Sequence, residues 1–333
     1  MQKLKLLYLL QIFKQQTDEE HALPAVELAQ KLQDMGIKAE RKSLYDDIKA
    51  LRDAGHDIQL SRALGNVGFY LANRTFELPE VRVLMDAVLS ASFITHKKTR
   101  ELIDKLQTLT SAHHALDISK QVYIDKQAKC SNEEILYSID AIHRAIAKKR
   151  RIAFTYHHTN VANIRSGKEF ELSPYVLVWE NDKYYLVGNY DKYENLSHYR
   201  VDRMKKVKIL DKRARSFEEV SPYRVRFNTA DYVKRSFHMF GGQAIVASLL
   251  CEAQAIEILL DKFGQDISIA KTEEGRYRAI IRVNLSEGLI EWLIQFGDII
   301  EVTEPPELRT GITRKLGEIA KSYNLAVFPE KTY

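Results

Sequence analysis

The sequence predicts a multidomain α+β protein: an N-terminal winged helix, a helical connector, a small β-barrel and a C-terminal ferredoxin-like domain. Three observations lead to this prediction. Apolar residues recur at helical spacing up to residue 55, the period changes to two from Arg151, and helical and strand patterns alternate from about residue 223. A chain of 333 residues is also too long for one ordinary core, so two or three domains are expected.

Composition excludes several classes of protein. Hydrophobic residues make up 45% and charged residues 29% of the chain, as in soluble globular proteins. No run of about eighteen apolar residues predicts a transmembrane helix. The apolar run LLYLLQIF ends at Lys14-Gln15-Gln16 without a small-residue cleavage site, so it does not predict a signal peptide. We therefore expect a cytoplasmic protein without a membrane partner.

Cysteine and histidine usage predicts neither a disulfide framework nor a metal site. Cys130 and Cys251 are far apart and lack His or Cys neighbours at ligand spacing. The pairs His113-His114 and His157-His158 hold side chains that diverge, and no carboxylate completes a set. The sequence also lacks a glycine-rich phosphate loop, a nucleophile elbow and a His-Glu-x-x-His motif. We expect no cofactor and no enzymatic activity.

Residues 1–75 predict a helix-turn-helix followed by a wing. A first amphipathic helix includes Leu4 to Phe13, and a second runs from Pro24 to Gly36. The segment ERKSLYDDIKALRDAG, which ends at Gly55, predicts the third helix. Residues 57–72 then alternate around glycines, which is typical of a β-hairpin. In a winged helix, the second helix of the helix-turn-helix enters the major groove of DNA.

The outward residues of the third predicted helix are candidates for DNA contacts. Arg41, Tyr45 and Lys49 lie four residues apart and share one face. Arginine suits guanine, whereas lysine and tyrosine suit phosphates. The full set of candidates is Lys38, Arg41, Lys42, Ser43, Tyr45 and Lys49 in the helix and the preceding turn, with Arg62 and Asn66 in the wing. An ordinary solvated helix face is the alternative, and Glu40, Asp46 and Asp47 oppose DNA unless they point to cytosine or away from it.

Residues 76–149 predict an amphipathic helical connector. Pro79 lies near the start of its first helix, and Ser131 with Glu134 forms a predicted capping box for its last helix. The apolar stripes of these helices are expected to pack against neighbouring domains or a second copy rather than a cofactor.

Residues 150–213 predict a small barrel of four or five strands, with turns at Gly167 and Asn181-Asp182. Residues 144–215 hold 17 Lys and Arg against 8 Asp and Glu. Such an excess of positive charge favours an anionic ligand, for example a nucleotide or single-stranded nucleic acid, although an ordinary basic surface has the same composition.

Residues 222–333 predict a ferredoxin-like domain. Strands are expected at YRVRFN and AIVASLLCEA, with DYVKRSFHMFGG between them as a helix or an elaborated loop. A helix, a hairpin around Glu274-Gly275, a helix, a strand and a last helix follow. The order β-α-β-β-α-β is that of ferredoxin-like folds.

The run SPYVLVWENDKYYLVGNYDKYENLSHYRVDR, which ends at Arg203, resembles a WYL domain. Tyr184-Tyr185-Leu186 stands where that family has Trp-Tyr-Leu, and HYRVDRM is similar to its Arg-x-x-Arg strand. Nearly the whole chain resembles the three-part WYL regulators, in which a winged helix precedes a WYL barrel and a C-terminal extension called WCX. The resemblance implies that the barrel of residues 150–213 is a small Sm/SH3-like β-barrel. The resemblance implies that Arg200 and Arg203 contact an anion, with Tyr185 and His198 near the same pocket.

Strand adjacency adds Tyr156, His158 and Ser173 to this predicted effector site, with Tyr175 on the same strands. A guanidinium forms bidentate bonds to phosphate, and an aromatic ring offers a stacking face for a base. Core packing is the alternative for Tyr184 and Tyr185, because adjacent strand residues point to opposite faces. For Arg203 the alternative is an ion pair with a barrel carboxylate.

We therefore expect a ligand-responsive transcription regulator that binds double-stranded DNA. One winged helix has a small footprint, so a homodimer on a palindromic operator is predicted. Repression is the simpler expectation, since a steric block needs no contact with polymerase. The effector is expected to be an anionic small molecule, a nucleotide or a short nucleic acid. The alternatives are a nucleic-acid-processing protein or accessory factor, and a single-strand or RNA-binding Sm-like protein.

Overall fold

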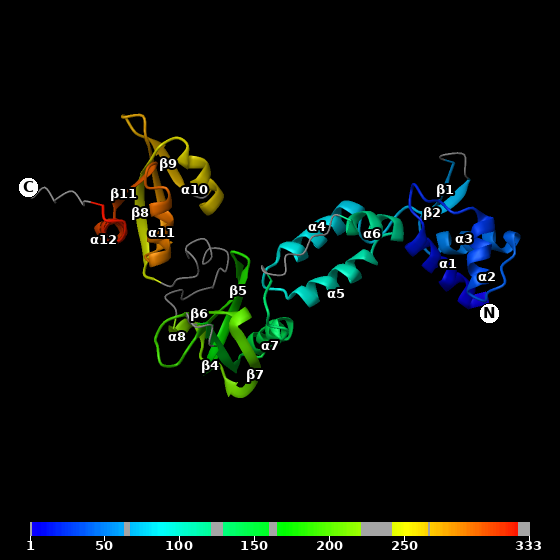
Figure 1. The fold of residues 1–333 in the computed structure, drawn as a ribbon, viewed down its shortest axis with the longest axis horizontal. Coiled ribbons are helices and arrows are strands. Elements are labelled where there is room, and N and C mark those ends of the chain that lie inside the picture. Colours follow the sequence, from blue (N-terminus) through cyan, green and yellow to red (C-terminus); the bar gives the residue numbers. More distant parts are fainter. Residues whose placement is uncertain are drawn as a thin grey trace, which may run out of the picture. The chain divides into compact units, whose positions relative to one another are not determined.

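The protein is described by a computed structural model that covers residues 2–62, 67–120, 129–159, 165–220, 242–265 and 267–325. The chain is a mixed α+β protein, as predicted, and divides into two compact units, residues 1–133 and 134–333 (Figure 1). Within the described ranges, no helix combines the length and the apolar character that a membrane span requires.

The N-terminal part of the first unit contains three helices and a hairpin. The helices are α1 (Gln2–Gln16), α2 (Ala25–Asp34) and α3 (Arg41–Asp53), and the antiparallel strands are β1 (Ile58–Ser61) and β2 (Gly68–Leu71). Gly36 and Gly55 follow α2 and α3 with φ of 78° and 94°, a left-handed conformation that favours glycine. The predicted helices and strands are therefore present, whereas residues 63–66 of the predicted hairpin lie outside the described residues.

One apolar core holds these elements together. Its buried side chains come from one face of each helix and from both strands, and they include Leu9, Phe13, Leu28, Leu44, Ile48 and Leu71. Because apolar residues recur every three or four positions, each helix has a continuous buried stripe and leaves its other face exposed. The core therefore fixes which face of α3 is exposed.

The rest of the first unit is helical. Its helices are α4 (Leu78–Ser90), α5 (His96–Gln107) and α6 (Ala112–Ser119). Side chains cap each start: the carboxylate of Glu80 accepts the backbone N–H of Glu77 at 2.9 Å, and Thr95 and Ser111 accept N–H groups of their own helices. A small cluster of Val81, Met85, Ile103 and Ile118 forms the apolar core of this part.

The second unit begins with α7 (Ile135–Ala147), which packs on a five-stranded antiparallel sheet. The sheet has the order β6-β5-β4-β3-β7, and its strands are β3 (Arg150–Thr159), β4 (Arg165–Glu180), β5 (Lys183–Asn189), β6 (Ser197–Arg200) and β7 (Met204–Arg213). The 3-10 turn η2 (Val201–Arg203) separates β6 from β7.

Two local predictions in this unit were wrong. No side-chain cap begins α7; the carboxylate of Glu134 accepts the backbone N–H of Lys206 at 3.0 Å instead. Gly167 lies within β4 opposite His157 rather than in a turn, and a Cβ there would lie 2.7 Å from the methyl group of Thr155. The turn at Asn181-Asp182 is confirmed, with φ of 46° and 63° at the two residues.

The C-terminal part of the second unit has the predicted β-α-β-β-α-β order. After the short helix α8 (Phe217–Val220), its elements are β8 (Ala244–Cys251), α10 (Ala255–Phe263), β9 (Ser268–Lys271), β10 (Tyr277–Asn284), α11 (Glu287–Gln295), β11 (Ile300–Glu304) and α12 (Pro306–Ser322). The antiparallel sheet has the order β11-β8-β10-β9. The strand predicted at 223–228 and the helix or loop predicted at 231–242 lie outside the described residues, except for Gly242.

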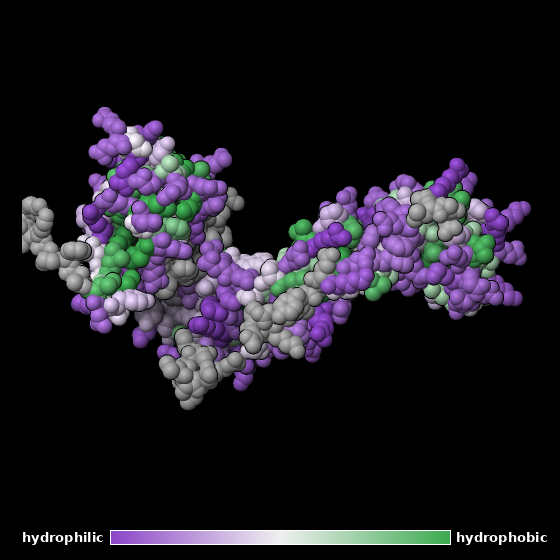
Figure 2. All heavy atoms as spheres, turned by 45° about the horizontal axis from the view of Figure 1, so that its top comes forward, coloured by the Kyte–Doolittle hydropathy of each residue, from purple (hydrophilic) through white to green (hydrophobic). Residues whose placement is uncertain are grey.

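Apolar side chains reach the surface of this C-terminal part, as the green area at the left of Figure 2 shows. Among the large side chains, Val246, Ile280 and Leu316 are each more than 40% exposed.

Candidate nucleic-acid interface and effector site

One face of α3 carries the predicted DNA-contacting side chains. Leu44, Ile48 and Leu51 are buried, whereas Arg41, Tyr45 and Lys49 are exposed. Lys38 and Lys42, at the start of the helix, are exposed as well. Within the described part of the chain, none of these four cations has an ion pair. The face is therefore free to contact an anionic partner.

Two contacts hold the hairpin against α3. The ring of Tyr45 packs edge-on against Phe69 in β2, with centroids 5.7 Å apart, and Nε of Arg52 donates to the carbonyl of Ile58 at 2.6 Å. Tyr45 nevertheless remains 45% exposed. On the hairpin, Arg62 is exposed, and Asn66 lies outside the described residues.

Ser43 does not share this exposed face. Its hydroxyl donates to the carbonyl of Glu40 at 3.0 Å and accepts a hydrogen bond from Nζ of Lys5 in α1, also at 3.0 Å. The same ammonium group lies 2.5 Å from Oδ2 of Asp47. Lys5 therefore neutralises one of the carboxylates on α3 that would oppose DNA, while Asp46 remains exposed.

Strand register brings the residues of the WYL-like motif together. Tyr185 of β5 lies opposite Arg200 of β6, and Val187 lies opposite His198. Directly opposed residues point to the same face of a sheet, so Tyr185, His198 and Arg200 share one face. Leu186 points to the other face, where it is fully buried, and Tyr184 stacks on Trp179 with centroids 5.8 Å apart.

The two arginines of the motif differ in their partners. The guanidinium of Arg200 donates to both carboxylate oxygens of Asp202, at 3.1 and 2.6 Å, and this bond raises the pKa of Arg200. Its backbone N–H donates to the hydroxyl of Tyr156 at 3.3 Å. Arg203 is exposed at the end of η2 and has no ion pair in the part of the chain that the structure describes. The carboxylate pairing considered for Arg203 is thus made by Arg200.

Burial changes the protonation of the side chains beside Arg200. It lowers the pKa of His198 to about 4, so the imidazole is neutral near pH 7. It also raises the pKa of Tyr185. Both groups therefore offer hydrogen bonds rather than charge, and the positive charge that the strand register places on this face is that of Arg200.

The three other predicted effector residues lie in different surroundings. Tyr156 is 7% exposed and packs among aromatic rings, with the ring of Tyr199 at 5.4 Å. Ser173 is fully buried opposite Asn189, and its hydroxyl accepts the backbone N–H of Arg215 at 3.0 Å. His158 pairs with Ser166 across β3 and β4. The structure therefore brings Tyr156 to the backbone of Arg200 and places Ser173 elsewhere.

Sequence reasoning missed Lys5 and Asp202. A signal existed for each: Lys5 lies four residues before buried Leu9, on the buried stripe of α1, and Asp202 lies two residues after Arg200. A buried ammonium group needs a partner that compensates for the loss of water. The partner of Lys5 is the carboxylate of Asp47, which lies 42 positions further along the chain.

Comparisons with known proteins identify two domains within the second unit. A family model described as the WYL domain matches residues 138–209, and one described as the WCX domain matches residues 224–320. YobV of Bacillus subtilis (strain 168), named as an uncharacterised HTH-type transcriptional regulator, is 23% identical over 295 residues. That alignment covers 85% of this chain and 89% of YobV.

Two solved structures also match, each at low structural similarity. Proteasome accessory factor B/C of Arthrobacter aurescens is 19% identical, with a TM-score of 0.28, over 99% of this chain and 48% of that one. A CRISPR Cas-related protein is 16% identical, with a TM-score of 0.38, over 66% of this chain and 61% of that one. This chain thus spans less than two thirds of either solved chain. The two domain models, in contrast, match in the order that the sequence predicts, and the chain carries a WYL domain followed by a WCX domain.

Proposed function

We propose that this protein is a sequence-specific, DNA-binding transcriptional regulator whose residues 1–75 act as a winged helix. The observation that carries the proposal is the exposed face of α3, where Arg41, Tyr45 and Lys49 lie side by side without ion pairs in the described chain. Helix α3 follows a short turn and precedes a hairpin, the arrangement in which a recognition helix enters the major groove. The name of the relative YobV, an HTH-type transcriptional regulator, supports the same function.

The protein acts as a homodimer on a palindromic operator. A single recognition helix contacts only a few base pairs, so two copies are needed for a specific site. Repression by a steric block is the simplest mode of action. The protein has no catalytic role in this function, and it acts in the cytoplasm.

The second unit senses an anionic effector through its WYL domain, an Sm-like barrel in this proposal. Arg203 supplies an exposed positive charge, and Tyr185, His198 and Arg200 lie on one sheet face. A small anion, a nucleotide or a short nucleic acid fits this chemistry, because guanidinium groups bind phosphate and aromatic rings stack on bases. The effector changes DNA affinity only if it binds unequally to two arrangements of the dimer.

Selection from a random duplex library tests the proposal. Purified protein is incubated with the library beside the double variant Arg41→Ala/Tyr45→Ala, and bound DNA is sequenced. The expected result is a palindromic consensus that the variant no longer selects. Weak, salt-sensitive binding without a consensus, both with and without candidate effectors, would reject the proposal in favour of single-strand or RNA binding. Cleavage of DNA with Mg²⁺ or Mn²⁺ would instead support a nucleic-acid-processing protein.

A further inference from the structure

The first unit contains two separate apolar cores with a polar joint between them. One core lies within residues 1–71, and the other lies within α4, α5 and α6. No described residue belongs to both clusters. The segments that meet between them are the end of α1 with the turn that follows it, the residues after β2, and the start of α6.

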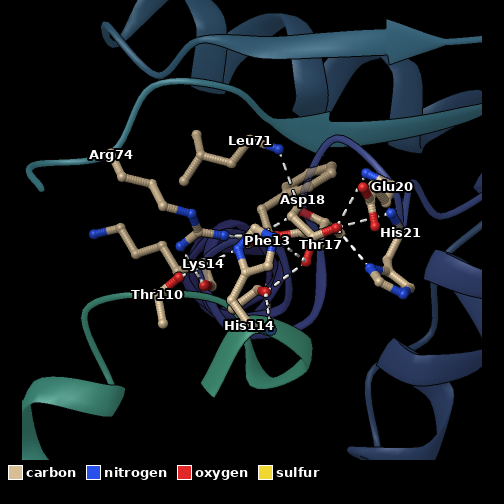
Figure 3. Close-up of polar contacts among 11 residues, drawn as sticks. Phe13, Lys14, Thr17, Asp18, Glu20, His21, Leu71, Arg74, Thr110 and His114 are labelled. Carbon is tan, nitrogen blue, oxygen red and sulfur yellow. Dashed lines mark hydrogen bonds and ion pairs between the residues drawn. The ribbon is translucent and has the colours of Figure 1, made fainter. Parts of the chain in front are cut away.

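Asp18 lies at the centre of this joint (Figure 3). Its side chain is 1% exposed. Oδ1 accepts the backbone N–H groups of Glu20 and His21 at 3.1 and 2.9 Å and lies 2.6 Å from Nδ1 of His21. Oδ2 accepts the hydroxyl of Ser111, the N-cap of α6, at 2.5 Å, and Nε2 of His114 lies 3.9 Å away. One carboxylate thus orders its own turn and binds the neighbouring helix.

Further directional contacts surround Asp18. The guanidinium of Arg74 donates to the carbonyls of Lys14 and Thr17, both at 2.6 Å, at the C-terminal end of α1. The imidazole of His21 stacks on that of His113 in α6, with centroids 3.7 Å apart and planes inclined by 4°. Hydrogen bonds and stacked rings restrict angles as well as distances, so these contacts define an orientation.

Apolar packing does not reinforce the joint on every side. A pocket of about 700 Å³ lies beside it, lined on one wall by Gln15, Gln16, Leu23 and Lys31 and on the other by Gln107, Thr108 and Thr110 with the start of α6. A filled interface resists rotation by steric contact, whereas a pocket leaves room for it. The angle between the two parts therefore depends on the buried polar contacts.

We propose that Asp18 is a positioning residue that sets the orientation of α3 relative to the connector helices and so determines which spacing of DNA half-sites the dimer accepts. The inference rests on the proposed function. In a dimer, half-site spacing equals the separation of the two recognition helices. Loss of the Asp18–Ser111 bond lets α3 take a wider range of angles, while the residues that contact bases remain unchanged.

Two variants and one matched control test this inference in the full-length protein. Asp18→Asn keeps the size of the side chain and removes its charge. Ser111→Ala removes the bond across the joint and leaves the bonds of Asp18 within its own turn intact. This variant therefore still tests the inference if Asp18→Asn does not fold. Asp117→Asn is the control, because Asp117 lies on α6 in an exposed ion pair with Lys120 at 2.9 Å.

Each protein is tested on the half-site selected by the wild type, with the spacing between half-sites varied one base pair at a time. The wild type and the control are expected to prefer one spacing. Both variants are expected to retain the half-site sequence while the preference for that spacing falls by about fivefold or more. Unchanged spacing preference in both variants would overturn the inference.

Hydrogen exchange of the free proteins separates this inference from the proposed function. The amides of Glu20 and His21 in Asp18→Asn and of His114 in Ser111→Ala are expected to exchange faster, and those within α3 and α5 are not. Faster exchange with unchanged spacing means that Asp18 orders the joint without setting specificity, which refutes the inference alone. A wild type that selects no consensus refutes the proposed function and the inference with it, whatever the exchange shows.

Discussion

The ammonium group of Lys5 lies 2.5 Å from a carboxylate oxygen of Asp47, so α1 holds the buried side of α3 through an ion pair. The two side chains are 8% and 16% exposed. Removing charges from water costs free energy that only a close partner offsets. The pair therefore explains why a lysine is tolerated on the buried stripe of α1, and it anchors the start of α3 through Ser43 as well.

Substitution of Lys5 is expected to destabilise the first unit. Lys5→Met fills the apolar stripe but leaves Asp47 as an unpaired, mostly buried charge, which typically costs about 3 kcal/mol. The double variant Lys5→Met/Asp47→Leu removes both charges and is expected to recover a large part of that loss. Urea denaturation of the wild type, both single variants and the double variant measures the coupling. Additive effects of the two substitutions would contradict a direct interaction.

The exposed face of α3 is expected to determine DNA affinity with little effect on stability. Arg41→Ala is expected to cost about 1–3 kcal/mol of binding free energy and to relax the preference at one base pair. Lys49→Ala is expected to weaken binding to all DNA sequences. The slope of log affinity against log salt concentration is expected to fall by about one, as for the loss of one phosphate contact. Titrations of labelled operator at several salt concentrations measure both effects.

A lysine on a different surface serves as the control for this face. Lys105 is exposed on α5, and Lys105→Ala removes the same charge as Lys49→Ala. Lys105→Ala is expected to lose little DNA affinity. A loss as large as that of Lys49→Ala would mean that α3 does not contact DNA.

Periodicity predicted most of the fold because each helix and strand buries a regular stripe of apolar side chains. The helices α1 to α3 and the order of elements from β8 to β11 follow directly from this pattern. The capping box at Ser131 failed for a long-range reason: the carboxylate of Glu134 accepts a backbone N–H of Lys206, 72 residues away. A partner so distant in sequence leaves no local signal.

The candidate sites were predictable where one helix or one pair of strands positions them. Helical spacing placed Arg41, Tyr45 and Lys49 on a common face, and the resemblance to WYL domains implied that His198 lies near Arg200, with which it shares a sheet face. Ser43 was predicted to contact DNA because it lies near the start of the same helix, but Lys5 binds it from another helix. The bond between Asp18 and Ser111 joins residues 93 positions apart, and only the folded chain reveals it.

The two arginines of the WYL-like motif are expected to respond differently to substitution. Arg203→Ala removes an exposed charge that forms no ion pair among the described residues, so it is expected to weaken binding of inorganic phosphate or a nucleotide without lowering stability. Arg200→Ala leaves Asp202, whose side chain is 11% exposed, without its bidentate partner, and is expected to cost about 2 kcal/mol of stability. Calorimetric ligand titration and thermal denaturation separate these effects.

Arg200→Lys provides the matched control, because it keeps the charge but loses the bidentate geometry. It is expected to be intermediate in stability between the wild type and Arg200→Ala. Equal stability of all three proteins would show that the bond to Asp202 is unimportant to the fold.

His198 is expected to make the stability of the second unit depend on pH between about 6.5 and 4. Burial lowers its pKa to about 4 in the folded protein, whereas an exposed histidine in the unfolded chain has a pKa of about 6.5. Above pH 6.5 the imidazole is neutral in both the folded and the unfolded state, so His198 does not make the free energy of unfolding depend on pH there. As the pH falls toward 4, only the unfolded chain binds the proton, so the free energy of unfolding decreases by up to about 3 kcal/mol.

Chemical denaturation of the wild type and His198→Gln at several pH values measures this contribution. Glutamine does not titrate, so the difference in unfolding free energy between the two proteins is expected to change across this window and to level off below pH 4. The titration of Asp18 changes the stability only at lower pH, because hydrogen bonds from Ser111 and His21 outweigh the effect of burial and lower its pKa below the usual value of 3.8.

An NMR titration midpoint near 6.5 for His198 would show that its imidazole is solvated and would remove the physical basis of the prediction.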